Sequence, residues 1–94
     1  MKITAAAAFA ILLTACATVS LQKASASLDQ GLSEDEVARR IGASPNTVST
    51  SNCGKNTGTW ECKVWKYEQG SGWLSIYFAA APDGLWRVDS WQMY

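Results

Sequence analysis

The stretch that decides the fold is residues 60–92, which have the sequence WECKVWKYEQGSGWLSIYFAAAPDGLWRVDSWQ. Apolar and polar residues alternate with a period of two over residues 60–68, 73–79 and 85–92, a pattern typical of strands with one buried face. Turn-forming residues separate these segments, GSG in the first gap and PDG in the second. The sequence therefore predicts a three-stranded antiparallel sheet built from two hairpins.

The two faces of the predicted sheet differ in polarity. Leu74, Ile76 and Phe78 are wholly apolar, so their face should pack against a helix. Trp65, Tyr67, Trp86 and Val88 are assigned to the same face. The opposite face should carry Lys66, Trp73, Ser75, Tyr77, Arg87, Asp89 and Trp91.

A face that mixes aromatic rings with charges, and that has no second layer over it, is typical of an interaction surface. The candidate partner-binding residues on it are Lys66, Trp73, Tyr77, Arg87 and Trp91. Two alternatives remain open. Another segment of the chain, either the N-terminal tether or the loop around Cys53, could fold over this face, or the rings could merely shield the sheet.

One helix is predicted from residues 32–42, LSEDEVARRIG. Ser33 and Glu36 have the spacing of a capping box, in which each side chain accepts a hydrogen bond from the backbone N–H of the other residue. The final glycine is a common helix terminator, so the helix should span residues 34–41. We interpret the carboxylates of its first turn as favourable to the helix dipole rather than as metal ligands, because no histidine accompanies them.

The N-terminus has the features of an export signal. A lysine precedes an apolar stretch of about a dozen residues, which is too short to span a bilayer that needs about 20. It ends in Leu13-Thr14-Ala15-Cys16, which looks like a bacterial lipobox, so residues 1–15 should be removed and Cys16 acylated. Residues 16–27 should then be a tether, with a weak helix from Leu21 towards Leu28, and residues 28–94 the folded domain. The alternative is an ordinary signal peptide, with Cys16 incidental.

Two further cysteines, Cys53 and Cys62, flank a segment rich in Gly, Asn and Ser, which favours a turn over residues 51–59. In an exported chain whose Cys16 carries lipid, these two thiols should form a disulfide. Zinc binding is disfavoured, because two cysteines without histidine fall short of four ligands. A redox role is disfavoured because the spacing is far from C-x-x-C.

Composition excludes several classes of function. The chain of 94 residues has 8 basic and 8 acidic residues, so it lacks the field that nucleic-acid binding requires. It has no histidine, no Gly-rich phosphate loop and no distinct pair of carboxylates, so we expect neither an enzyme nor a cofactor. Removing residues 1–15 leaves 79, enough for one small domain with a thin core.

Short motifs of this sequence resemble the BamE/SmpA-type small outer-membrane lipoproteins. The matching motifs are Gly31-Leu32-Ser33 with Glu36-Val37 at the helix start, Ile41-Gly42-x-x-Pro45 after it, Trp65-Lys66-Tyr67, Leu74-x-Ile76-x-Phe78 and Asp83-Gly84-Leu85. The resemblance implies an α+β fold, with one or two short helices packed on a three-stranded antiparallel sheet. The Cys53–Cys62 loop is not part of that family's pattern. The helix-plus-sheet arrangement is also similar to the repeats of β-lactamase-inhibitor proteins.

The resemblance implies a function in binding. The expected protein is a lipid-anchored accessory or scaffold protein of the outer membrane, facing the periplasm, which assists β-barrel assembly through contacts with an envelope protein. Ala17 follows the acylated cysteine, and lipoproteins without Asp there are usually sent to the outer membrane. The alternative is a lipid-tethered inhibitor or ligand-binding module. In either case the chain should be monomeric outside its complex.

Overall fold

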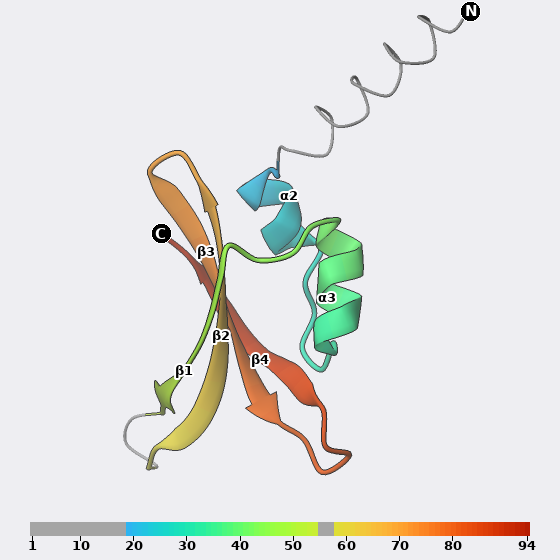
Figure 1. The fold of residues 1–94 in the computed structure, drawn as a ribbon, viewed down its shortest axis with the longest axis vertical. Coiled ribbons are helices and arrows are strands. Elements are labelled where there is room, and N and C mark those ends of the chain that lie inside the picture. Colours follow the sequence, from blue (N-terminus) through green and yellow to red (C-terminus); the bar gives the residue numbers. More distant parts are fainter. Residues whose placement is uncertain (1–18, 55–57) are drawn as a thin grey trace, which may run out of the picture.

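The computed structural model describes residues 19–54 and 58–94, and has two layers, a pair of short helices and an antiparallel sheet (Figure 1). The helices are α2, Leu21–Ala26, and α3, Glu34–Ile41. The strands are β1, Thr47–Cys53, β2, Trp60–Gln69, β3, Gly72–Ala80, and β4, Trp86–Met93. The predicted signal peptide and the predicted lipid site at Cys16 lie outside the described residues.

The prediction of a three-stranded sheet is wrong, because the sheet has four strands in the order β1-β2-β3-β4. The additional strand is β1, which pairs antiparallel with β2 from Thr47 opposite Lys66 to Cys53 opposite Trp60. Its sequence, TVSTSNC, contains a single aliphatic residue and nearly all of it is exposed. A strand that buries no face shows no period-two pattern, so hydrophobicity could not reveal it. Residues 51–53, expected to be part of a turn, belong to this strand.

The core lies between the helices and the sheet face that carries Leu74, Ile76 and Phe78, as predicted. Trp65, Tyr67 and Val88 are also buried in it, and Trp86 is partly buried against it. The Tyr67 hydroxyl donates a hydrogen bond to the Ala43 carbonyl oxygen at 2.7 Å, and burial raises the pKa of this tyrosine to about 12. Its buried polar atom is thus paired, which avoids the cost of an unsatisfied group.

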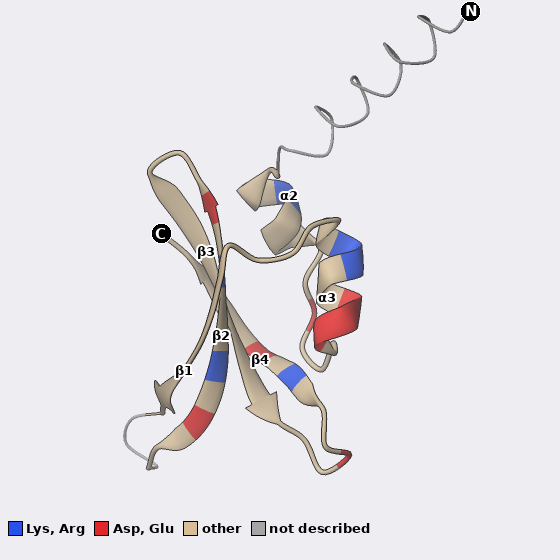
Figure 2. Cartoon of the chain, in the orientation of Figure 1, with Lys and Arg blue, Asp and Glu red and all other residues tan. Residues whose placement is uncertain are grey.

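Helix α3 begins and ends as predicted. Ser33 and Glu36 form the capping box: the Glu36 carboxylate accepts from the Ser33 N–H at 2.9 Å, and the Ser33 hydroxyl accepts from the Glu36 N–H at 3.3 Å. The hydrogen bond from the Ser33 backbone holds the pKa of Glu36 below its ordinary value. Gly42 ends the helix with a left-handed φ of 84°. Acidic residues mark the first turn and basic residues the last (Figure 2), which suits the helix dipole.

Helix α2 lies within residues 16–27, the segment predicted to be a tether. Ser20 caps it, and its Leu21 and Ala24 are buried in the same core as the strands. The Leu21 N–H also donates to the Gln69 side-chain oxygen at 3.1 Å, which ties the start of the helix to the end of β2. The packed domain therefore begins before residue 28.

A register shift between Tyr77 and Phe78 changes which residues of β4 face the helices. Val88 lies opposite Phe78, but Ser90 lies opposite Tyr77 and Trp91 opposite Ile76, so Asp89 is an extra residue. An extra residue in one strand reverses the alternation of all residues beyond it. Trp91 consequently packs partly buried against the core, and its predicted place on the opposite face is wrong.

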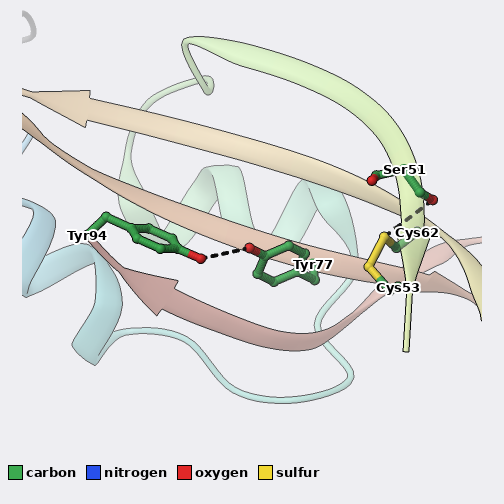
Figure 3. The surroundings of a disulfide bond; sticks show 5 residues. All are labelled: Ser51, Cys53, Cys62, Tyr77 and Tyr94. Atoms are coloured by element: carbon green, nitrogen blue, oxygen red, sulfur yellow. Dashed lines mark hydrogen bonds between the residues drawn. A yellow bond between two sulfur atoms is a disulfide. The ribbon is translucent and has the colours of Figure 1, made fainter. Parts of the chain in front are cut away.

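The predicted disulfide between Cys53 and Cys62 is present and joins the end of β1 to β2, with 5.9 Å between the Cα atoms (Figure 3). Cys62 is fully buried. Its sulfur lies 3.5 Å from the Ser51 carbonyl oxygen, and because a disulfide sulfur carries no proton this is a packing contact. The bond fixes a strand that has little hydrophobic area of its own.

We expect replacement of both Cys53 and Cys62 by alanine to lower the free energy of unfolding by about 2–3 kcal/mol, the loop-closure entropy of about ten residues. Urea unfolding with and without reductant measures this difference. The variant should be insensitive to reductant, whereas the parent protein should lose stability when reduced. Equal stability of the oxidised and reduced parent would contradict the expectation.

The open face of the sheet as a candidate interaction surface

Both helices lie on one side of the sheet, so the other side has no second layer among the described residues (Figure 1). Residues directly opposite each other on neighbouring strands share a face. Lys66, Ser75 and Gln92 are opposite one another in this way, as are Tyr77 and Ser90. We call this side the open face and define it by Lys66, Trp73, Ser75, Tyr77, Ser90, Gln92 and Tyr94.

Aromatic rings dominate one end of the open face. Trp73 and Tyr94 stack with 5.1 Å between ring centroids and 20° between ring planes. Their backbones also pair, because each N–H donates to the carbonyl oxygen of the other, at 3.2 and 2.8 Å. The stack is therefore held by the sheet itself, although Tyr94 remains 52% exposed. Such prearranged rings offer a large contact area without further ordering.

A chain of hydroxyl groups extends the stack along the face. The Tyr94 hydroxyl donates to the Gln92 side-chain oxygen at 3.3 Å, and the Tyr77 and Tyr94 hydroxyl oxygens lie 3.3 Å apart (Figure 3). Either hydroxyl can be the donor between the two tyrosines. The hydrogen bond with Tyr77 raises the pKa of Tyr94 above its ordinary value.

Lys66 supplies the positive charge of the open face. Its ammonium lies over the Trp73 ring, 4.9 Å from the centroid, a cation–π contact. Ser75 lies directly opposite Lys66 and is almost fully buried beneath the surrounding side chains. The face thus combines a cation, two stacked rings and several hydroxyl groups, which is the mixed character of a protein interface.

A shallow hollow of about 410 Å³ continues the open face towards the disulfide. It is lined by Asn52, Cys53, Gly54, Trp60, Tyr77, Asp89 and Ser90. Gly54 has a φ of +98°, and a Cβ there would lie 2.3 Å from the Gly58 carbonyl oxygen, so only glycine fits at this position. The disulfide-bonded Cys53 therefore forms part of the wall of the hollow.

Of the five predicted partner-binding residues, the open face brings together Lys66, Trp73 and Tyr77. Arg87 lies opposite Ala79, on the same side of the sheet as Tyr77, but its guanidinium is engaged at the edge of β4, where it forms an ion pair with Asp83 at 2.6 Å and donates to the Gly31 carbonyl oxygen at 3.0 Å. The side-chain hydrogen bond from Arg87 lowers the pKa of Asp83. The pair is engaged within the chain and does not extend the aromatic surface.

Sequence reasoning missed Tyr94, Gln92 and Ser90 because the open face depends on the extra residue in β4. If the alternation is restarted after Asp89, all three fall on the side of Trp73. The only sequence signal was the polar pair at positions 89 and 90. That signal is weak, because exposed polar pairs also occur in regular strands.

Within residues 19–54 and 58–94, no helix is long and apolar enough to cross a membrane. The same part of the chain holds no group of three His, Cys, Asp or Glu side chains placed to bind a metal ion. Comparison with known proteins finds no matching family, no matching curated protein and no matching solved structure. The open face is accordingly interpreted from its own chemistry.

Proposed function

We propose that this chain is a lipid-anchored accessory or scaffold protein of the bacterial outer membrane, facing the periplasm, which binds an envelope protein through the open face. The observation that carries the proposal is the Trp73–Tyr94 stack on a sheet face that no described element covers. The lipobox at Cys16 supports the location, and the BamE/SmpA-like motifs favour components of β-barrel assembly as the partner.

Energetic reasons favour protein binding on this face. Trp and Tyr are the residues most enriched among those that carry the binding energy of interfaces, and they do so when neighbouring contacts exclude water. Trp73 and Tyr94 form such a centre, and Gln92, Tyr77 and Lys66 surround it with polar groups. Tethering to a membrane would raise the effective concentration towards other envelope proteins, so a moderate affinity would suffice.

A second candidate function is favoured by the hollow beside the disulfide. A volume of about 410 Å³ is within the range of small-ligand sites, and the lining includes Trp60 and Tyr77 as apolar walls. A tethered ligand-binding module or inhibitor would use this end of the open face. Binding of a ligand in the hollow would survive loss of the lipid anchor. Assembly with membrane proteins would weaken without the anchor.

The test is crosslinking in native membranes from a photoreactive residue placed at Tyr77 or Gln92 on the open face. Arg39, exposed on α3, serves as the matched control position. We expect one dominant adduct from the open-face positions and none from Arg39, with barrel-assembly components as the partner identified. Replacing Cys16 by serine should reduce the yield. Silent open-face positions, or an adduct from Arg39 alone, would contradict the proposal.

A further inference from the structure

The two edge strands of the sheet, β1 and β4, differ in whether another segment of the chain covers them. At the β4 edge, the Gly31 N–H donates to the Val88 carbonyl oxygen, and the Val88 N–H donates to the Leu32 carbonyl oxygen, both at 2.9 Å. The Gln30 side-chain amide donates to the Asp89 carbonyl oxygen at 2.8 Å. The segment before α3 thereby covers the middle of this edge and satisfies backbone groups that would otherwise face solvent.

At the other edge, β1 has no described strand on its outer side. An edge strand presents a row of unpaired N–H and C=O groups, and proteins that must avoid pairing place charges, prolines or bulges there. The sequence of β1, TVSTSNC, contains no charged residue and no proline, and its pairing with β2 runs in continuous register. All of its residues except Cys53 are exposed.

The edge of β1 is also prearranged for pairing. Its seven residues pair with β2, and the disulfide from Cys53 to Cys62 holds its far end. A partner strand would therefore meet a template that is already ordered, so association would require little further loss of conformational entropy. An edge that is open, uncharged and covalently secured contrasts with the covered edge at β4.

We infer that β1 binds an extended segment of a partner protein by strand addition, with main-chain hydrogen bonds providing affinity. The exposed side chains of β1 determine which sequence of the partner segment fits. Val48 is 53% exposed on the helix side of the sheet, where the helices pack on the later strands, whereas Ser49 and Ser51 face the other way. The fitting segment is uncharged and alternates polar and apolar residues, with an apolar side chain beside Val48.

A second copy of this chain fits the edge less well. Antiparallel self-pairing centred on Thr50 would place each Val48 opposite Asn52, which leaves the exposed valine against an amide. A register that pairs Val48 with Val48 would use only residues 47–49 of the strand. A partner segment with its own apolar residue avoids both defects. The backbone edge of β1 is distinct from the Trp73–Tyr94 stack that carries the proposed function, so its test does not depend on that proposal.

The probe is a short blocked peptide in which threonine and valine alternate between terminal lysines, titrated into the isotopically labelled mature protein. We expect saturable chemical-shift changes and slowed amide exchange confined to β1, with Ser90 and Gln92 unaffected. A peptide of the same sequence with N-methyl groups on alternate residues should bind at least about tenfold more weakly, because it cannot form the ladder.

The variant that tests the side chain is Val48→Lys, which should weaken peptide binding about tenfold or more, because a lysine on an edge strand disfavours pairing. Ser90→Lys, on the open face, is the matched control and should leave binding unchanged. Thermal unfolding confirms that both variants fold. The inference is overturned if the peptide does not bind, if N-methylation or Val48→Lys has no effect, or if sedimentation shows a dimer of the chain that Val48→Lys dissociates.

Discussion

Replacing Trp65 by alanine is expected to lower the free energy of unfolding by about 3–5 kcal/mol, the range for removing a large buried aromatic side chain. Trp65 is buried on β2 and lies 5.0 Å from Phe78 between ring centroids. Its indole N–H donates to the Glu34 carboxylate at 3.0 Å, and that carboxylate also pairs with Lys63 at 2.9 Å. The residue thus joins the start of α3 to the centre of the sheet.

A loss of this size would be severe, because small domains have a total stability at the low end of about 5–15 kcal/mol. Urea unfolding followed by circular dichroism measures it. Trp65→Phe is the matched control, since it keeps an aromatic ring but loses the N–H to Glu34 and part of the buried ring volume, and it should cost about 1–2 kcal/mol. A loss below about 1 kcal/mol for Trp65→Ala would show that the helix layer contributes little to the stability of the sheet.

The second large effect is expected on partner binding, from Trp73→Ala combined with Tyr94→Ala. Central aromatic residues of interfaces typically contribute 2 kcal/mol or more, which corresponds to a loss of at least about 30-fold in affinity. Both rings lie on the open face, where their removal opens no cavity in the core. Folding should therefore be retained, and thermal unfolding should show it.

The measurement is the yield of the adduct crosslinked from Gln92 in native membranes, compared between this double variant and the parent. Leu85→Ala is the matched control, because it removes an exposed apolar side chain in the turn between β3 and β4. Trp73→Phe should retain part of the yield, since a smaller ring can still stack on Tyr94. If the double variant and Leu85→Ala give the same yield as the parent, the aromatic stack is not the binding centre.

Much of the fold was predictable because it depends on local patterns. Residues 34–41 carry their own start and stop signals, and α3 matches them in both bounds. The segments with period-two alternation became β2, β3 and β4 to within about two residues, the usual uncertainty of element ends. The disulfide followed from the expectation that the chain is exported with two cysteines left to pair, and the structure contains the bond. Each of these features can be identified from neighbours in the sequence.

The candidate site was predicted less completely. Lys66, Trp73 and Tyr77 were assigned to one face correctly because regular alternation holds across β2 and β3. Beyond Asp89 that alternation is reversed, so Trp91 was misplaced and Tyr94 overlooked. A bulge depends on how two strands pair, and hydrophobicity along one strand carries little trace of it. Because the extra residue Asp89 was not foreseen, the prediction placed Trp91 on the open face, where the structure has Tyr94.

By itself the sequence determined which segments could be helix α3 and the three amphipathic strands, because capping and periodicity act between residues close in the chain. Only the tertiary structure decided that the polar segment Thr47–Cys53 forms a fourth strand, that α2 packs into the core, and that β4 changes phase at Asp89. These outcomes depend on pairing between distant segments. Backbone hydrogen bonding and a shared core select them, and neither leaves a periodic signature in a single stretch of residues.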